Sequence, residues 1–345
     1  MLSLQDIHHS YESVPALKGV DLEVNEGEIV CLLGQSGCGK STLMNLAAGL
    51  LDLQRGEITL GDKLLSSPKH HVPPEKRPMG LVFQEGALFP HLTIEKNIVF
   101  GVSDIAKHSQ ITRQLLEQIG LSGYEDRYPH TLSGGQRQRV ALARALARQP
   151  SVLLMDEPFA SIDVLMRRHI REDIYHLLKA RHCTTILITH DPEEAIEIAD
   201  KIAVMEAGKI TQFGTAKHLY DSPKSLFVGL MSGDGAVLKG RRKDQYFITD
   251  FGRFDLADLK IIGSPQRDGD MSLLLRHNSV RLSAVKVDGG IKVRDIRETG
   301  EGNIVTLENS RGQLLLLHVE PQAGIDVGQC LELDVKGRCV SVFVT

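Results

Sequence analysis

Short apolar runs separated by helical patterns fill the first part of the chain. Four runs have the length and composition of buried strands, at residues 28–33, 151–155, 184–189 and 201–205. Helical patterns lie between them, at residues 41–51, 93–120 and 136–147. Strands that alternate with helices along a chain predict a parallel sheet of the α/β class.

Shorter signals surround these elements. Residues 2–7 and 20–24 predict two short strands near the start of the chain, and residues 56–61 predict a further strand and turn. The polar, proline-containing stretch 66–78 predicts an exposed loop. A last short strand is expected at residues 80–83.

The pattern changes after about residue 233. Alternating strands are expected at residues 272–275, 291–296, 304–307, 313–319, 330–335 and 339–344, with turns at 288–290 and 309–312. Regular short strands with few helices are typical of a small β-barrel or sandwich. We therefore expect two domains, at residues 1–233 and 234–345, joined by a polar, glycine-containing link.

Composition narrows the class of protein. Of the 345 residues, 42% are hydrophobic and 24% charged, with a net charge of -4. These values are ordinary for a globular protein and do not favour a nucleic acid as partner. No signal peptide and no apolar run of membrane-spanning length is apparent. The five cysteines are sparse and contain no C-x-x-C pair, which argues against a disulfide framework or a zinc site and fits a reducing cytoplasm.

The strongest chemical motif follows the first buried strand. It matches the phosphate-binding pattern G-x-x-x-x-G-K-[ST] with Gly34, Gln35, Ser36, Gly37, Cys38, Gly39, Lys40 and Ser41. Such a loop turns successive N–H groups inward at a helix N-terminus and so forms an anion site. Lys40 is expected to reach the β- and γ-phosphates, and Ser41 to ligate Mg²⁺.

Two further motifs complete a nucleotide site. Asp156 and Glu157 end the strand at residues 151–155, where Asp156 can hold Mg²⁺ and Glu157 can polarise the attacking water. Ser133, Gly135 and Gln136 open the helix at 136–147, where free N–H groups offer a second anion site.

Together these motifs resemble the ATP-binding-cassette (ABC) ATPases over residues 1–230. The resemblance implies a RecA-like core, an antiparallel β subdomain, a helical subdomain at about residues 85–150 and a C-terminal OB-like regulatory barrel. It also implies roles for single residues. Tyr11 stacks on adenine, Thr42 joins the nucleotide site, Gln84 contacts Mg²⁺ and water, and His190 contacts the γ-phosphate.

The same resemblance implies a homodimer that sandwiches two ATP molecules with Mg²⁺. Ser133, Gly135 and Gln136 then meet the γ-phosphate held by the opposite protomer. Asp163 is present in the segment that crosses this dimer, but Ala160 stands where the family commonly has serine.

Three short sequence segments resemble those of importer subunits for maltose, polyamines, sulfate and ferric ions. They lie at residues 86–93, 189–195 and 212–215. The resemblance implies a permease that docks near residues 84–92, on an apolar patch of Leu88, Phe89 and Pro90. It further implies a periplasmic substrate-binding protein and a place at the cytoplasmic face of the bacterial inner membrane.

The overall run of residues is most similar to ferric-ion importers, with polyamine, sulfate and sugar importers as alternatives. His8, His9, His70 and His71 could suggest iron binding, but no carboxylate constellation surrounds them. ABC ATPases of DNA repair and translation are a different class, and usually carry a coiled-coil insertion or tandem cassettes. This chain has neither.

Overall fold

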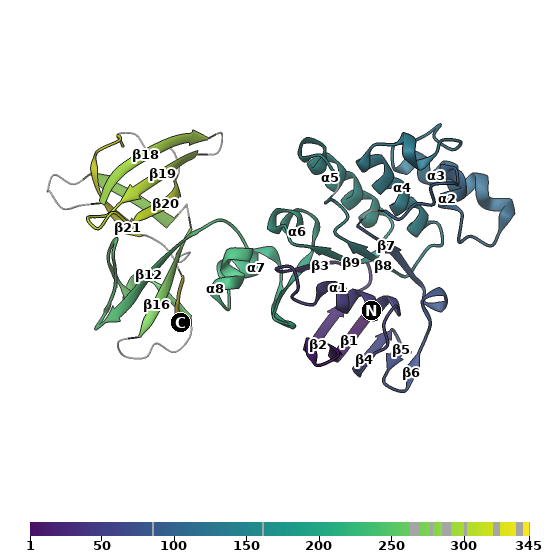
Figure 1. Cartoon of the computed structure of the whole chain (residues 1–345), viewed down its shortest axis with the longest axis horizontal. Coiled ribbons are helices and arrows are strands. Elements are labelled where there is room, and N and C mark those ends of the chain that lie inside the picture. Colours follow the sequence, from purple (N-terminus) through teal and green to yellow (C-terminus); the bar gives the residue numbers. More distant parts are fainter. Residues whose placement is uncertain are drawn as a thin grey trace. The chain divides into compact units, whose positions relative to one another are not determined.

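The computed structural model describes residues 1–84, 86–160, 162–262, 269–276, 279–284, 291–299, 302–319, 325–335 and 341–344. The turn expected at 288–290 and the first two residues of the strand expected at 339–344 lie outside these ranges. The chain forms two compact units, Met1–Ala216 and Lys217–Thr345 (Figure 1).

A mainly parallel sheet forms the centre of the first unit. Its order is β11-β10-β3-β9-β8-β7 among the described residues, with β3 (Ile29–Leu33), β7 (Met79–Val82), β8 (Val152–Asp156), β9 (Thr184–Thr189), β10 (Lys201–Glu206) and β11 (Lys209–Gly214). All neighbours are parallel except β10 and β11. Every residue of β3 and β9 is buried, as their continuous apolar runs predict. The expected α/β fold is confirmed.

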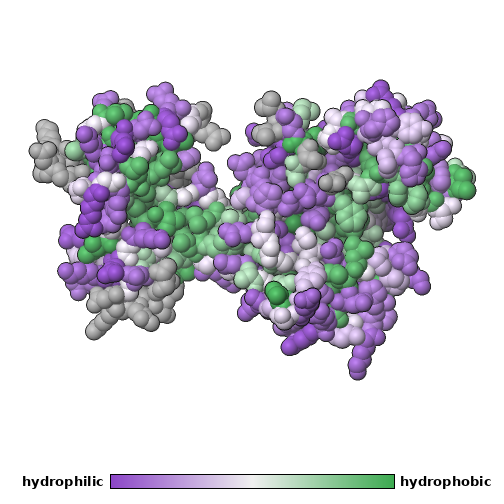
Figure 2. All heavy atoms as spheres, viewed as in Figure 1, coloured by the Kyte–Doolittle hydropathy of each residue, from purple (hydrophilic) through white to green (hydrophobic). Residues whose placement is uncertain are grey.

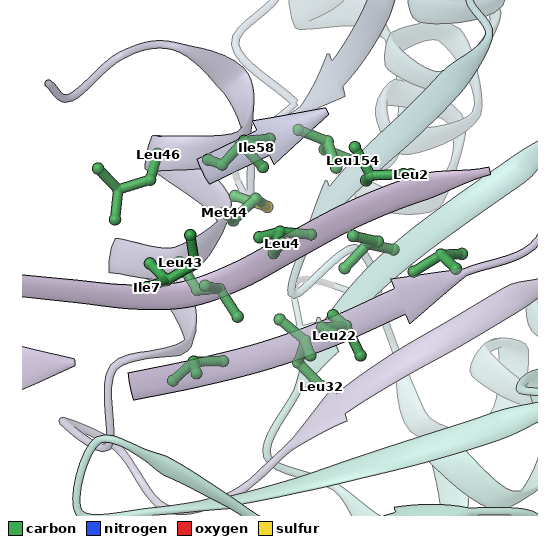
Figure 3. Packing of buried hydrophobic residues seen from close by; sticks show 14 of the residues in the cluster. Leu2, Leu4, Ile7, Leu22, Leu32, Leu43, Met44, Leu46, Ile58 and Leu154 are labelled. Atoms are coloured by element: carbon green, nitrogen blue, oxygen red, sulfur yellow. The ribbon is translucent and has the colours of Figure 1, made fainter. Parts of the chain in front are cut away.

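An antiparallel sheet covers one side of this core. Its order is β2-β1-β4-β5-β6, with β1 (Leu2–Tyr11), β2 (Val14–Val24), β4 (Arg55–Leu60), β5 (Lys63–Ser67) and β6 (His70–His71). Helix α1 (Lys40–Ala48) packs against both sheets through Leu43 and Met44, which meet Leu4 of β1 and Leu32 of β3 in one apolar cluster (Figure 3). This cluster fixes the helix that follows the phosphate-binding motif.

The expectation of an exposed loop at residues 66–78 is correct for the exposure of most of these residues, but not for their secondary structure or for Arg77. This stretch contains the end of β5, all of β6 and the 3-10 helix η1 (Pro74–Lys76). Arg77 follows and is 2% exposed, with its guanidinium donating to the backbone oxygens of Leu46 and Ala47 at 3.0 and 2.6 Å. Arg77 therefore belongs to a buried hydrogen-bond network, whereas residues 68–71, 75, 76 and 78 of the same stretch are exposed.

The helix expected at residues 136–147 is present as α4, whereas the other two expected helices are shorter or divided. The expected helix at 93–120 is divided into α2 (Ile94–Ile98), η2 (Ile105–Lys107) and α3 (His108–Gln118). The others are η3 (Pro129–Thr131), α4 (Gly134–Leu146), α5 (Val164–Ala180) and α6 (Pro192–Ile198). Among the described residues, no helix has the length and hydropathy needed to cross a bilayer.

The second unit is almost entirely β-structure. Helices α7 (Ala216–Asp221) and α8 (Leu226–Met231) precede two sheets among the described residues, with orders β14-β13-β12-β16-β22-β15 and β17-β21-β18-β19-β20. The strands are β12 (Ala236–Lys243), β13 (Tyr246–Thr249), β14 (Gly252–Asp255), β15 (Lys260–Ile262), β16 (Asp270–Leu275), β17 (Val280–Ala284), β18 (Ile291–Thr299), β19 (Gly302–Glu308), β20 (Leu314–Val319), β21 (Cys330–Val335) and β22 (Ser341–Val344), with η4 (Leu256–Asp258) after β14.

The inward faces of these strands share one apolar core, and the all-β architecture is consistent with the expected OB-like barrel. Apolar side chains also gather on the face of this unit seen in Figure 2. Edge strand β20 carries two exposed leucines, Leu314 and Leu316. The sequence pattern did not predict β12 to β15 or β17. The expected domain boundary, after residue 233, lies beyond the two short helices α7 and α8.

Candidate functional site

The phosphate-binding motif lies between β3 and α1, at the carboxyl edge of the parallel sheet. Helix α1 begins at Lys40, and its N-cap Gly39 has a left-handed backbone with φ of 106°. No side chain caps this helix end, and no acidic residue lies in its first turn. The backbone N–H groups at the start of α1 are therefore available to an anion.

Close backbone approaches explain two of the glycines in the loop. A Cβ atom on Gly34 would lie 2.3 Å from the backbone oxygen of Met205, and one on Gly39 would lie 2.7 Å from that of Ala16. Gly37 has a positive φ of 82° and faces open space. Within the loop, the N–H of Cys38 donates to the backbone oxygen of Gln35 at 3.3 Å. Ser36 is exposed.

Lys40 is folded back over the loop. Its Nζ donates to the backbone oxygens of Gly34 at 2.7 Å and Gln35 at 3.0 Å, and the residue is only 6% exposed. An ammonium held by two carbonyl oxygens, without a carboxylate partner in these contacts, keeps its positive charge available. The loop and its lysine thus fit a phosphate group, as the motif predicts.

Three predicted residues from three different segments meet at Glu157. Glu157 follows β8 with a positive φ of 41°, and its N–H donates to the backbone oxygen of Ile188 at 3.0 Å. Its Oε1 lies 3.1 Å from Nδ1 of His190, and its Oε2 accepts from Nε2 of Gln84 at 3.5 Å. The Glu157 side chain is 22% exposed. The carboxylate is therefore oriented by two neighbours and still reachable from solvent.

Asp156 lies at the end of β8, next to this group. Burial, together with the nearby Glu157 carboxylate, raises the pKa of Asp156, while the charge of Lys40 opposes the shift. The repulsion from Glu157 and the attraction to Lys40 both indicate a common site. A cation bound there would reduce the repulsion between the carboxylates of Asp156 and Glu157.

The metal residues expected from the sequence are Ser41, Gln84 and Asp156. Ser41 and Gln84 are exposed, and Asp156 is half-buried. They offer a hydroxyl, an amide and a carboxylate oxygen, which are donors that Mg²⁺ accepts when phosphates and water supply the remaining ligands. Within the described ranges, no cluster of three or more His, Cys, Asp or Glu side chains could hold a metal by itself.

Tyr11 connects the antiparallel sheet to the loop. Its hydroxyl lies 3.3 Å from Oγ1 of Thr42 on α1, and its ring meets His9 edge-on at a centroid distance of 5.0 Å. Tyr11 is 49% exposed. An aromatic face beside the start of α1 is therefore open to a planar ligand.

The second predicted anion site lies at the start of α4. Ser133 is the N-cap, and it forms a reciprocal capping box with Gln136, with bonds of 3.3 and 3.0 Å. A Cβ on Gly135 would lie 2.7 Å from Cδ1 of Ile170, so α4 and α5 pack closely there. In the described part of the chain, the side-chain bonds of Ser133 and Gln136 remain with each other and with Tyr124.

Asp163 lies at the start of α5, where its backbone oxygen accepts from the N–H of Arg167 at 2.9 Å. Ala160 is exposed, and its N–H donates to the backbone oxygen of Glu157 at 3.2 Å. A short chain segment therefore joins Glu157 to Asp163.

An open groove lies beside Gln84. It is lined by Phe83, Gln84, Ala87, Leu88, Pro90, Pro129, His130, Arg137 and Asp156. Phe83 is 40% exposed, whereas Leu88 and Phe89 are half-buried. Sequence reasoning missed Phe83, His130 and Arg137, although Arg137 directly follows the motif at Ser133–Gln136.

Comparison with known proteins agrees with this geometry. The family model described as ABC transporter matches residues 17–160. The chain is 44% identical over 245 residues to a sulfate/thiosulfate import ATP-binding protein of Chromobacterium violaceum, covering 70% of this chain and 66% of that protein. It is 47% identical over 222 residues to an Fe(3+) ions import ATP-binding protein of Rhizobium meliloti, covering 63% of this chain and 55% of that protein.

One relative matches nearly throughout. A sulfate/thiosulfate import ATP-binding protein of Nocardia farcinica is 38% identical over 325 residues, which cover 90% of this chain and 92% of that protein. A solved dimeric, post-hydrolysis structure of the ATP-binding cassette MJ0796, bound to ADP and Pi, is 28% identical with a TM-score of 0.55. It covers 62% of this chain and 98% of that one. The chain therefore belongs to the ABC transporter family, among its import ATP-binding proteins.

Proposed function

We propose that the protein is the ATP-hydrolysing subunit of an ABC importer. The observation that carries this proposal is the Glu157 carboxylate, which His190 and Gln84 orient beside a phosphate-binding loop. The loop presents a buried lysine and an uncapped helix start. A phosphate-binding loop with an oriented carboxylate next to it fits hydrolysis of a nucleoside triphosphate.

In this proposal the residues of the first unit hold ATP in three places. Tyr11 stacks on the adenine, the backbone N–H groups of residues 34–42 surround the phosphates, and Lys40 meets the β- and γ-phosphates. Ser41, Gln84 and Asp156 would hold Mg²⁺. When bound, that ion supplies positive charge that stabilises the phosphate oxygens during transfer.

The chain's own residues then prepare the water. Glu157 accepts a hydrogen bond from the attacking water and polarises its O–H bond as a general base. His190 orients Glu157 through the 3.1 Å contact and, in this proposal, also contacts the γ-phosphate. Gln84 completes the set by holding the second carboxylate oxygen.

A second copy of the chain completes the proposed site. Within one protomer, Ser133 and Gln136 cap the start of α4 themselves. In the proposed dimer, Ser133, Gly135 and Gln136 of one copy would face the ATP of the other. Asp163 would contact the partner at the same interface. The solved dimer of MJ0796 with ADP and Pi supports this arrangement.

We further propose that a permease helix docks in the groove beside Gln84. The groove combines exposed apolar surface from Phe83 and Pro90 with the positive charge of Arg137. Amphipathic helices bind grooves of this kind. Because Gln84 lines the groove and contacts Glu157, a helix there could influence hydrolysis. The protein would lie at the cytoplasmic face of the inner membrane and serve a periplasmic substrate-binding protein.

The cargo is the least constrained part of the proposal. Ferric iron is the prediction from the sequence, and the 47% identical relative supports it. Sulfate or thiosulfate is a second candidate, because a relative that matches over nearly its full length is named for it. Uptake of radioactive iron and sulfate by cells with and without the gene would distinguish the two.

The second unit contains no nucleotide motif, and we propose that it regulates transport or contributes to the dimer. Its own apolar core supports an independent folding unit. Its exposed edge strand β20 offers a surface for contact.

The hydrolytic proposal is tested by Glu157→Gln in the purified protein. We expect ATP affinity to be retained and turnover to fall by at least about a hundredfold, since an amide is a poor proton acceptor. Glu172→Gln is the matched control, because Glu172 is an exposed carboxylate on α5. Wild-type turnover in Glu157→Gln would remove Glu157 from this role.

A further inference from the structure

Arg167, on the first turn of α5, is bound to the segment that follows Glu157. Its backbone N–H donates to the backbone oxygen of Asp163 at 2.9 Å. Its Nη2 donates to the backbone oxygen of Ile162 at 3.2 Å. The guanidinium is thereby fixed relative to the Ile162–Asp163 backbone.

The other side of the same guanidinium faces two carboxylates. Nη1 of Arg167 lies 4.0 Å from Oδ2 of Asp191 and 4.0 Å from Oε1 of Glu194. The Arg167 side chain is 25% exposed and the Glu194 side chain 5%. Because the Glu194 carboxylate is buried, its attraction to the guanidinium is screened by water less than that of a surface pair. Ile162, Asp191 and Glu194 are thus the partners of the guanidinium among the residues that the structure describes.

Glu194 in turn binds the Thr189 hydroxyl, which connects the residues on both sides of His190. Its Oε2 accepts from Oγ1 of Thr189 at 2.5 Å, and the same Oγ1 accepts from the N–H of Asp191 at 3.0 Å. Burial raises the pKa of Glu194, whereas the Thr189 hydroxyl and the guanidinium groups of Arg171 and Arg167 favour its ionised form. His190 then reaches Glu157 at 3.1 Å.

We propose that Arg167 is a positioning residue that links the Ile162–Asp163 segment to the backbone of His190. Both segments flank Glu157, the first along the chain and the second in space. Through Arg167 and Glu194 they move as one unit. This inference rests on the proposed function: if Asp163 meets a second copy of the chain, Arg167 transmits that contact to His190.

Because of where Arg167 lies, its loss should reduce turnover without the loss of ATP affinity that a change in a binding residue causes. In the described part of the structure, its contacts go to Ile162, Asp163, Asp191 and Glu194, and none goes to the phosphate-binding loop. Loss of the guanidinium should therefore misplace His190 and Glu157 while leaving the groups that bind ATP in position. Small displacements of catalytic groups reduce kcat far more than they reduce binding.

Three purified full-length variants test the proposal. In Arg167→Gln we expect kcat to fall about tenfold or more and the Kd for ATP to stay within about twofold of wild type. Arg167→Lys keeps the positive charge near Asp191 and Glu194 but loses the planar fork, so it should recover part of kcat. Arg168→Gln is the control, because Arg168 is its exposed neighbour, and it should turn over like wild type.

A double-mutant cycle with Glu194→Gln tests whether Arg167 acts on His190 through Glu194. If Arg167 acts through Glu194, the loss of kcat in the double variant is smaller than the product of the two single losses. Multiplicative losses would overturn the route through Glu194. Wild-type kcat in Arg167→Gln, or a parallel loss of ATP affinity and thermal stability, would overturn the positioning role. An inactive wild-type protein would instead contradict the proposed function itself.

Discussion

At the scale of single residues, the chemistry depends on a few charges held close together. Lys40 begins α1, Asp156 ends β8 and Glu157 follows it, and the charges of Lys40 and Glu157 both act on Asp156. Lys40 is almost entirely buried, with only backbone oxygens as its hydrogen-bonding oxygen partners. A positive charge held in this way is arranged for an anion that arrives later.

Lys40→Ala should weaken ATP binding at least about tenfold, because it removes the charge that meets the phosphates. Isothermal titration calorimetry measures this directly. The control is Lys76→Ala, which removes an exposed lysine of the same unit. Equal affinity in Lys40→Ala and wild type would contradict the phosphate-loop assignment.

Asp156 gives a prediction about stability and pH. Its pKa is raised in the folded protein, so its ionised form opposes folding above that pKa, and this cost disappears as the pH falls through it. Asp156→Asn should therefore raise the thermal midpoint of the nucleotide-free protein at about pH 7, and the gain should shrink toward about pH 4.

The same substitution should impair Mg²⁺-dependent turnover, because the carboxylate is a proposed metal ligand. Differential scanning calorimetry at both pH values measures the stability difference. A gain that is constant across pH would show that the ionised carboxylate is not its cause.

At the scale of elements, the parallel sheet brings the site residues together. Gly34, Asp156 and His190 each follow a strand whose carboxyl end lies at the same sheet edge. The strands were predictable because their apolar runs are continuous and short. The site residues were predictable because the motifs mark the ends of those strands.

Other parts of the fold depend on tertiary contacts and could not be read from local patterns. The sequence of residues 66–78 is that of a polar loop. Arg77 is nevertheless buried, and its guanidinium donates to backbone oxygens of α1. The link between Arg167 and Glu194 likewise joins residues distant in sequence. In both cases, nothing in the local sequence distinguishes a buried arginine from an exposed one.

Arg77 gives a prediction at this scale. It donates to the backbone oxygens of Leu46, Ala47 and Val72, and burial lowers its pKa to about 10. Arg77→Met should destabilise the protein by about 3 kcal/mol or more, since it leaves buried carbonyl oxygens without donors. Lys76→Met, at the exposed neighbouring position, should change stability little. Denaturant unfolding of both variants measures the difference, and equal stabilities would refute the structural role of Arg77.

At the scale of the whole molecule, the two compact units suggest a division of labour. The proposed nucleotide residues all lie within Met1–Ala216. Residues 226–232 belong with the second unit, where Arg276 donates to the backbone oxygen of Gly229 at 2.8 Å. A shortened chain is therefore better ended before α8 than after Met231.

A chain of residues 1–216 should bind ATP with an affinity close to that of the full-length protein, as calorimetry can determine. Its dimerisation or its control of transport should change, because contacts made by the second unit are lost. Loss of ATP binding in a folded truncated protein would contradict this division. If assembly and transport are both unchanged, the second unit contributes neither to the dimer nor to the regulation of transport.

The most direct measurement is the identity of the nucleotide bound to Glu157→Gln. The variant is incubated with Mg²⁺ and ATP, separated from free nucleotide, and its bound nucleotide is analysed by chromatography, with Glu172→Gln treated in parallel. If Glu157 activates water at a site that otherwise binds ATP normally, Glu157→Gln retains ATP while Glu172→Gln and wild type yield ADP. ADP formed by Glu157→Gln at the wild-type rate would contradict the proposed mechanism.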